Sequence, residues 1–165
     1  RSAIRATAPY VPDPAALLTR ADVLAGQITG AECATVACVL LDPATGELSY
    51  ATAGHPPILV VHAAGGTTYL DGGRGLPLAV SRTARASAIT TLAPGDQLVL
   101  YTDGLYERRR ESPDVGLARL ASLAAEARGL PPTELSHALA DGMLAGAAPE
   151  DDLCVLVAAP ALTRD

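Results

Sequence analysis

A run of strand-like apolar residues that ends in an aspartate and a glycine constrains this chain more than any other stretch. The run extends from Gln97 to Thr102, Asp103 and Gly104 follow it, and a segment rich in Glu and Arg comes next. A strand would hold the Asp103 carboxylate in place, Gly104 would let the backbone come close, and oxygen is the ligand that Mg²⁺ and Mn²⁺ prefer. An Asp-Gly pair is also common in turns, so this motif alone supports a turn and a metal ligand about equally.

A second acidic cluster lies far downstream, where Glu150, Asp151 and Asp152 precede the apolar run 153–159. Carboxylates at the ends of two strands can serve one metal site although they are distant in sequence. We therefore predict that Asp103 and Asp151 lie within metal-bridging reach of each other, at neighbouring strand ends. The pairing favours metal binding over turn chemistry for Asp103.

Composition limits the classes of protein to which the chain can belong. Its 165 residues correspond to one domain, and a hydrophobic content of 49% is ample for a core, built without Trp or Phe. A net charge of −6 argues against non-specific binding to nucleic acid or a membrane surface. No apolar run reaches the roughly 18 residues of a membrane-spanning helix, and no signal peptide is visible. The three cysteines lack CxxC spacing and are typical of reduced core residues in a cytoplasmic protein.

Hydrophobic periodicity and turn residues predict the individual elements. Residues 1–8 are compatible with a helix, and a second helix begins after Asp13 and ends at Gly30. The run 34–41 has the continuous apolar character of a central strand. The other predicted elements are strands at 48–53, 58–62, 67–70, 86–92, 97–102 and 153–159, helices at about 115–128 and 133–145, and a helical segment through Arg108, Arg109 and Arg110.

The connections between the strands predict antiparallel sheets. We expect residues 34–70 to form a meander, with a hairpin turn at 42–46, and residues 86–102 a hairpin around Pro94-Gly95-Asp96, because hairpin connections join antiparallel strands. The glycine-rich segment 72–80 is expected to be a surface loop, with a flap near a substrate as a further hypothesis. Strands followed by helices, with one strand to close, indicate an α+β layered domain.

Four motifs, taken together, resemble one protein family. Each alone is of moderate specificity, but they occur in family order at plausible spacing. On their account the chain resembles the SpoIIE/RsbU branch of the metal-dependent (PPM, type 2C-like) serine/threonine phosphatases, over nearly its whole length. The motifs are Ala-Thr-Ala-Gly-His-Pro-Pro at 51–57, Gly-Leu-Pro-Leu-Ala-Val at 75–80, Pro-Gly-Asp at 94–96 followed by Leu-Val-Leu-Tyr-Thr-Asp-Gly at 98–104, and Glu-Asp-Asp at 150–152 with its strand.

The resemblance implies a fold and a metal centre. The fold would be a four-layer α-β-β-α sandwich with two antiparallel sheets. Two Mn²⁺ or Mg²⁺ ions would hold a water that attacks a phosphoserine or phosphothreonine directly. Asp103 and Asp151 would be catalytic metal ligands, Gly104 would have a positional role beside the ligand, and Asp152 would bond the backbone or a metal-bound water.

One family motif has no counterpart in this chain. The family supplies a further aspartate, which bridges both metals, in a Gly-Asp-Val-x-Gly-His-Gly-like motif ahead of its first long helix. Residues 1–8 resemble the end of that helix, so we expect residues 1–165 to form the C-terminal three quarters of a single phosphatase domain. This chain alone is accordingly expected to be inactive.

The resemblance also implies a partner. The substrate would be a phosphorylated STAS-domain anti-anti-sigma protein of bacterial stress or sporulation signalling, in the cytoplasm. The resemblance is compatible with a homodimer. It implies neither a nucleic acid nor a membrane as a partner. The alternative is a catalytically inactive phosphatase-like scaffold in the same signalling.

Among other polar residues, His55 is interpreted as part of a rigid corner. His62 and His137 are interpreted as surface residues without carboxylate partners, and 108–110 as a solvated helix face.

Overall fold

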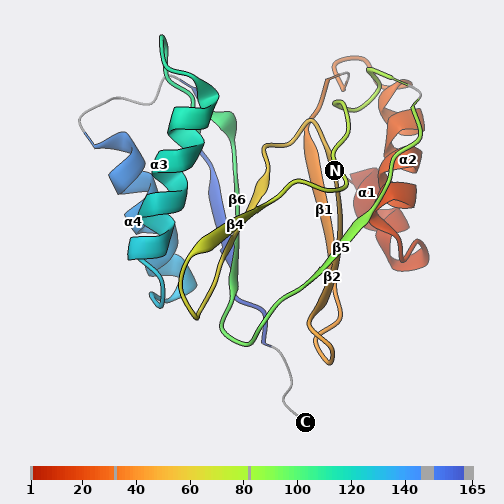
Figure 1. Ribbon diagram of the computed structural model, residues 1–165. Coiled ribbons are helices and arrows are strands. Elements are labelled where there is room, and N and C mark those ends of the chain that lie inside the picture. Colours follow the sequence, from red (N-terminus) through yellow and green to blue (C-terminus); the bar gives the residue numbers. More distant parts are fainter. Residues whose placement is uncertain (1, 32, 82, 146–150, 162–165) are drawn as a thin grey trace. The chain divides into compact units, whose positions relative to one another are not determined.

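A computed structural model describes residues 2–31, 33–81, 83–145 and 151–161, so Glu150 lies outside the described residues. The chain divides into two compact units. Among the described residues, unit 1 contains those within 2–55 and 71–92, and unit 2 contains those within 56–70 and 93–161. Each unit has one antiparallel sheet with helices against it (Figure 1). The predicted α+β fold with two antiparallel sheets is therefore confirmed.

Unit 1 packs helices against a three-stranded sheet. Asp13 caps the main helix, since its Oδ2 accepts a 2.8 Å hydrogen bond from the Ala16 amide, and Pro14 occupies the first helical position. Leu18 of that helix lies in a core with Ala51 and Ala53 of the middle strand. The elements are α1 (Ser2–Thr7), η1 (Ala8–Tyr10), α2 (Pro14–Ala25), β1 (Val36–Leu41), β2 (Glu47–Ala53) and β5 (Ala88–Thr91), with strand order β1-β2-β5.

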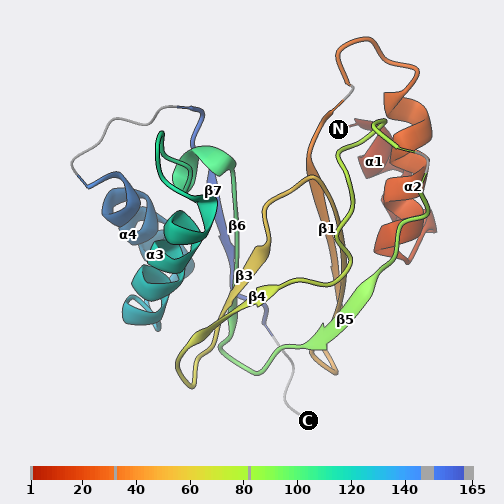
Figure 2. The same cartoon turned by 45° about the horizontal axis from the view of Figure 1, so that its top comes forward.

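Unit 2 packs two helices against a four-stranded sheet (Figure 2). Leu59 and Val99 on the sheet contact a layer of fully buried leucines that includes Leu120 and Leu139. The elements are β3 (Ile58–Val61), β4 (Thr67–Leu70), β6 (Gln97–Tyr101), η2 (Asp103–Leu105), α3 (Pro113–Glu126), α4 (Pro132–Leu144) and β7 (Val155–Ala158), with strand order β4-β3-β6-β7.

Two predicted strand pairings are wrong. Strand β3 does not continue the pairing of β2, because β2 pairs with β1 and β5 whereas β3 pairs with β4 and β6. The two prolines that separate these strands cannot donate ladder hydrogen bonds, so the chain leaves one sheet and enters the other. Strands β5 and β6 likewise belong to different sheets and form no hairpin. Turn residues show where a chain turns, but they do not identify the strand with which it pairs.

Three local predictions in unit 1 also need correction. Strand β1 is an edge strand among the described residues, not a central one. Helix α2 ends at Ala25 and not at Gly30, and Ile28, which lies within the predicted helix, is 54% exposed. The cysteines are free, as expected, but Cys33 is exposed and Cys38 is only half-buried; in unit 2, Cys154 is exposed as well. A short apolar run is compatible with a buried and with an edge position, and periodicity alone does not distinguish them.

The segment 72–80 is fastened to β2 and is not a free surface loop. The carbonyl oxygens of Gly73 and Gly75 accept hydrogen bonds from the Thr52 and Gly54 amides, at 2.8 and 2.7 Å. Leu78 is only 5% exposed and belongs to the unit 1 core. The segment therefore extends the sheet edge in its hydrogen bonding although its own dihedral angles are irregular.

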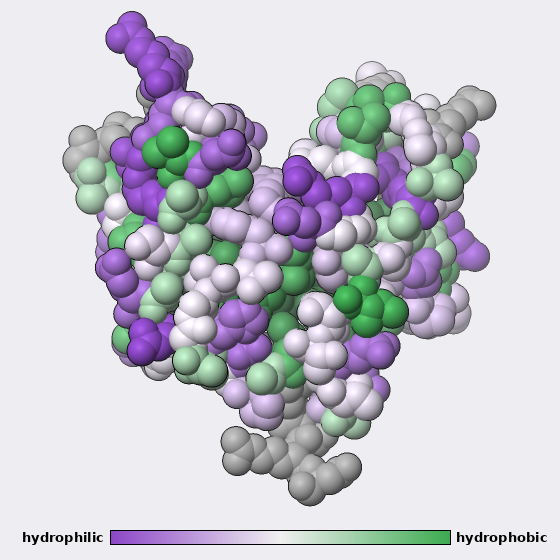
Figure 3. Space-filling view, in the orientation of Figure 1, coloured by the Kyte–Doolittle hydropathy of each residue, from purple (hydrophilic) through white to green (hydrophobic). Residues whose placement is uncertain are grey.

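The arginine run does not lie on a helix. After the three-residue η2 the backbone is irregular as far as Ser112, and Arg110 has a positive φ of 70°. A left-handed residue cannot continue a right-handed helix, so α3 starts only at Pro113. Among the described residues no helix is long and apolar enough to cross a membrane. On the face shown in Figure 3, strongly apolar residues lie in separate small groups among polar ones.

Candidate functional site

The two predicted metal ligands lie at adjacent ends of paired strands. Strands β6 and β7 are antiparallel, with Tyr101 opposite Val155. Asp103 comes two residues after Tyr101, where β6 ends, and Asp151 comes shortly before β7 begins. Antiparallel pairing places the end of one strand beside the start of the other, which brings the two aspartates to the same edge of the sheet.

Thr102 fixes the approach of Asp151 and Asp152 to β6. Its hydroxyl donates to the Asp152 carbonyl oxygen at 2.9 Å and accepts from the Cys154 amide at 2.9 Å. Its amide donates to the Cys154 carbonyl at 3.1 Å. These three hydrogen bonds hold the residues before β7 in register with the residue before Asp103.

Gly104 permits this close approach. A Cβ added at Gly104 would lie 2.7 Å from the Asp152 carbonyl oxygen and 3.1 Å from that of Asp151. Real Cβ atoms essentially never approach a heavy atom within 3.0 Å. The geometry thus agrees with the positional role expected for this glycine.

Asp103 and Asp151 line one pocket of about 300 Å³, together with Gly104, Glu107, Arg108 and Arg109. Both carboxylates are exposed, and each has one oxygen turned toward the backbone. Asp103 Oδ1 accepts from the Gly104 amide at 2.9 Å, and Asp151 Oδ1 accepts from the Asp152 amide at 2.7 Å. The Oδ2 atoms have no hydrogen-bond partner among the described residues. The pocket therefore offers two carboxylate oxygens to a ligand.

These donors suit a hard cation but do not complete a centre for two ions. Carboxylate oxygen is the ligand type that Mg²⁺ and Mn²⁺ require. Within the described ranges, however, no group of three or more His, Cys, Asp and Glu side chains is arranged to hold a metal ion. Asp152 approaches the site through its backbone, and its side chain is exposed.

Sequence reasoning missed three residues of the pocket. Glu107, Arg108 and Arg109 were interpreted as parts of a helical segment, yet η2 turns them back toward Asp103. The Glu107 amide donates to the Asp103 carbonyl at 2.9 Å, and an Arg108 Nη2 hydrogen bond to the Met143 carbonyl fastens the segment to α4. These three residues follow Asp103 closely in the sequence, and this proximity is the feature that could have indicated their place in the pocket.

One histidine, His62, differs from its interpretation, whereas His137 is exposed as expected. His62 has a carboxylate partner: its Nδ1 lies 3.1 Å from Asp96 Oδ2, and its Nε2 lies 2.9 Å from the Thr68 hydroxyl. Asp96 is only 4% exposed. Burial raises its pKa, but hydrogen bonds from the Ala63 and Ala93 amides and from His62 outweigh burial, so the pKa of Asp96 is lowered. This cluster joins the β3–β4 hairpin to the turn before β6 and lines no described pocket.

The chain matches one protein-family model and is similar to several solved structures. The family model described as Stage II sporulation protein E (SpoIIE) matches residues 1–160. Among solved structures, the RsbU and RsbW domains of Rv1364c from Mycobacterium tuberculosis align with a TM-score of 0.86 at 29% identity, over 96% of this chain and 46% of that one. The chain therefore spans less than half of that protein's length.

Two further structures share the fold at lower identity. The SpoIIE phosphatase domain from Bacillus subtilis, presoaked with Mn, aligns with a TM-score of 0.66 at 16% identity, over 98% of this chain and 72% of that one. RsbX in complex with magnesium aligns with a TM-score of 0.65 at 17% identity, over 94% and 70%. At these identities the likeness shows the fold alone.

Proposed function

Because the chain belongs to the Stage II sporulation protein E family of PP2C-type phosphatase domains, we propose that it is part of a metal-dependent phosphoprotein phosphatase in which Asp103 and Asp151 bind Mn²⁺ or Mg²⁺. The observation that supports this proposal is the convergence of the two carboxylates in one pocket, at the joined ends of β6 and β7. When bound, the ions would supply an activated water.

The residues of this chain have separate roles in the proposal. The carboxylates of Asp103 and Asp151 offset the positive charge of the cations. Gly104 and Thr102 keep the backbone before β7, which carries Asp151, close to the segment that carries Asp103. Arg108 and Arg109 bring positive charge to the same pocket, where a phosphate group is stabilised by guanidinium groups.

The proposed substrate is a phosphorylated STAS-domain protein of sigma-factor signalling in the cytoplasm. Family resemblance supports it, as does the likeness to a protein that contains RsbU and RsbW domains. The second candidate is a catalytically inactive scaffold of the same signalling. It is supported by the described residues, among which no group of three or more His, Cys, Asp and Glu side chains is arranged to hold a metal ion.

The first experiment tests residues 1–165 alone. Hard cations gain affinity from the charge and number of their ligands, so calorimetric titration with Mn²⁺ should show weak binding or none. Hydrolysis of a phosphoserine substrate should be very slow. Tight stoichiometric binding of two ions would contradict this expectation and would show that further ligands exist in the chain.

The second experiment tests the complete natural protein that contains this chain. Asp103→Asn should nearly abolish turnover of a phosphorylated STAS protein at saturating Mn²⁺, because the variant keeps the shape of the side chain but loses its negative charge. With chelator, its melting temperature should rise slightly, since crowded carboxylates repel one another without metal.

Asp141→Asn, the same change at an exposed site on α4, is the matched control and should keep full activity. Full turnover of Asp103→Asn would remove this aspartate from the mechanism. A complete protein that neither binds Mn²⁺ nor turns over the substrate would favour the scaffold. His55→Ala should mainly lower stability; loss of turnover in a well-folded His55→Ala would instead assign the histidine a catalytic role.

A further inference from the structure

A second polar pocket lies within unit 1, and none of its residues belongs to the Asp103 pocket. It has a volume of about 210 Å³, and its lining contains two guanidinium groups and two hydroxyl groups but no carboxylate. The lining residues are Arg74, Gly75, Leu76, Ser81, Thr83, Ala84 and Arg85. The lining side chains are therefore positively charged, and the carboxylates of Asp22 and Asp71 lie beside the two arginines but outside the lining.

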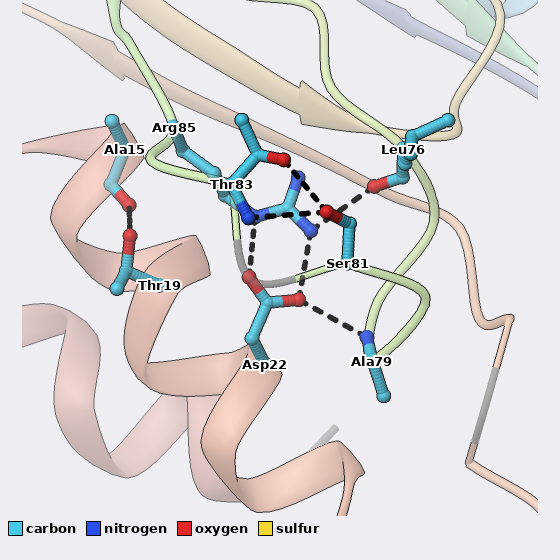
Figure 4. A network of polar contacts seen from close by, with 8 residues as sticks. All are labelled: Ala15, Thr19, Asp22, Leu76, Ala79, Ser81, Thr83 and Arg85. Carbon is cyan, nitrogen blue, oxygen red and sulfur yellow. Dashed lines mark hydrogen bonds and ion pairs between the residues drawn. The ribbon is translucent and has the colours of Figure 1, made fainter.

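Arg85 is the fixed part of this pocket. Its side chain is only 7% exposed, and it forms a bidentate ion pair with Asp22, with Nε–Oδ2 and Nη2–Oδ1 distances of 2.7 Å (Figure 4). Nη2 also donates to the Leu76 carbonyl at 3.0 Å. The hydrogen bond to Arg85 is the largest cause that lowers the pKa of Asp22, so this carboxyl stays ionised and holds the guanidinium in one orientation.

The third nitrogen of Arg85, Nη1, has no hydrogen-bond partner among the described residues. It lies on the side of the guanidinium away from Asp22 (Figure 4). Asp22 lines a neighbouring cavity of about 600 Å³, whereas Arg85 lines the smaller pocket. A Cβ at Gly75 would lie 2.7 Å from Nη1, so the absence of a side chain at Gly75 lets the guanidinium pack closely against the backbone there. An almost fully buried guanidinium thus presents an unused donor to the smaller pocket.

The other polar groups of the pocket can add to this donor. The Ser81 and Thr83 hydroxyls lie 2.6 Å apart, and each can turn its remaining hydrogen-bonding capacity outward. Arg74 is 59% exposed and lies 4.0 Å from the exposed carboxylate of Asp71, a pairing that contributes little in water. Arg74 is therefore able to turn toward an anion in the pocket.

From this arrangement we infer that the Arg74–Arg85 pocket binds a phosphoryl group, either as free phosphate or as a phosphate ester. A carboxylate has two oxygens, and one guanidinium fork satisfies both. A phosphoryl group has three or more oxygens and up to two negative charges, which matches two guanidinium groups and two hydroxyls. The larger neighbouring cavity is less suited to an anion, because Asp22 lines it. The Asp22 carboxylate accepts hydrogen bonds from Arg85 and from the Ala79 amide, and it offers a phosphate no donor.

The test is an NMR titration of the 165-residue chain in a phosphate-free, low-salt buffer, with inorganic phosphate, O-phosphoserine and acetate as separate probes. We expect saturable shifts at the amides of Gly75, Ser81 and Thr83. Arg74→Gln should weaken phosphate binding by about tenfold or more, the usual effect of losing one charge-assisted contact. Arg20→Gln, which removes the same charge from an exposed site on α2, should bind as the wild type does.

A second variant tests the fixed donor without removing Arg85, whose loss would leave Asp22 unpaired. Gly75→Ala would place a Cβ 2.7 Å from Nη1 and 3.2 Å from the Thr52 carbonyl oxygen, so the guanidinium must shift away from residue 75, and the phosphate-induced shifts should be lost. Comparison of inorganic phosphate with O-phosphoserine distinguishes a free ion from an ester. Unchanged affinity in Arg74→Gln, equally tight binding of acetate, or shifts confined to Gly104 and Glu107 would each overturn the inference. The last result would assign phosphate to the Asp103 pocket and would leave the proposed function intact.

Discussion

The close approach of Gly104 to the residues before β7 allows a quantitative prediction for Gly104→Ala. The new Cβ would lie 2.7 Å from the Asp152 carbonyl oxygen, so that oxygen must move by about 0.7 Å to reach an ordinary contact distance of 3.4 Å. The Thr102 hydroxyl lies 2.9 Å from the same oxygen, and the shift would stretch this hydrogen bond beyond a useful length.

The expected cost is the sum of two effects. Loss of the Thr102 hydrogen bond costs about 1 kcal/mol, and the remaining overpacking costs about 1 kcal/mol or more. For a chain of this size, a loss of about 2 kcal/mol lowers the melting temperature by about 4–8 °C. The amide signals of Asp151 and Asp152 should move, because these residues absorb the displacement.

Thermal unfolding and amide NMR spectra of the variant test this reasoning. Gly26→Ala is the matched control: Gly26 has a φ of −67°, and its added Cβ would lie 3.5 Å from the nearest atom, the Asp22 carbonyl oxygen. It should melt at or slightly above the wild-type temperature. A Gly104→Ala variant that melts like the wild type, with unmoved Asp151 and Asp152 signals, would refute the proposed contact.

Two further predictions concern the cores and the helix cap. Leu139→Ala removes a fully buried side chain from the unit 2 core and should lower the free energy of unfolding in urea by about 2–5 kcal/mol. Leu156→Ala, at a site that is 55% exposed, should change it by less than about 0.5 kcal/mol. Equal losses in the two variants would contradict the packing of α4. Asp13 has a lowered pKa, chiefly through the hydrogen bond from Ser87, so its contribution to stability is present above the ordinary value of 3.8 and is lost as the pH falls through the lower folded value. Asp13→Asn keeps the cap but cannot titrate, so the stability advantage of the wild type should shrink as the pH falls below 3.8; a difference that stays constant with pH would exclude this linkage.

The site could be predicted from sequence where its residues are set by strand ends. Asp103 follows an apolar strand and Asp151 precedes another, so both positions were visible in the pattern, and they line one pocket. The positions of Glu107 and Arg109 could not be predicted, because their segment of the sequence is also compatible with a helix. The positive φ of Arg110 excludes a continuous helix there, and the pattern of apolar residues does not indicate this backbone conformation.

Long-range partners were the other limit of the sequence. The pairing of His62 with Asp96 joins residues that are 34 positions apart, and no spacing rule connects them. The bidentate contact of Arg85 with Asp22 spans 63 positions and was equally invisible. In the same way, the pairing of β5 with β2 depends on which strand has a free edge, which only the folded sheet determines.

The position of β7 in the sequence affects the order in which the parts of unit 2 can form during translation. Among the described residues, β7 follows α3 and α4, is the last strand and lies at the edge of its sheet. A chain still attached to the ribosome can therefore form β6 and both helices while the pocket beside Asp103 lacks its second carboxylate. The vacant edge of β6 would then accept any strand of matching pattern, including β7 from another copy. The Asp103 pocket is thus among the last features of unit 2 to be completed during translation.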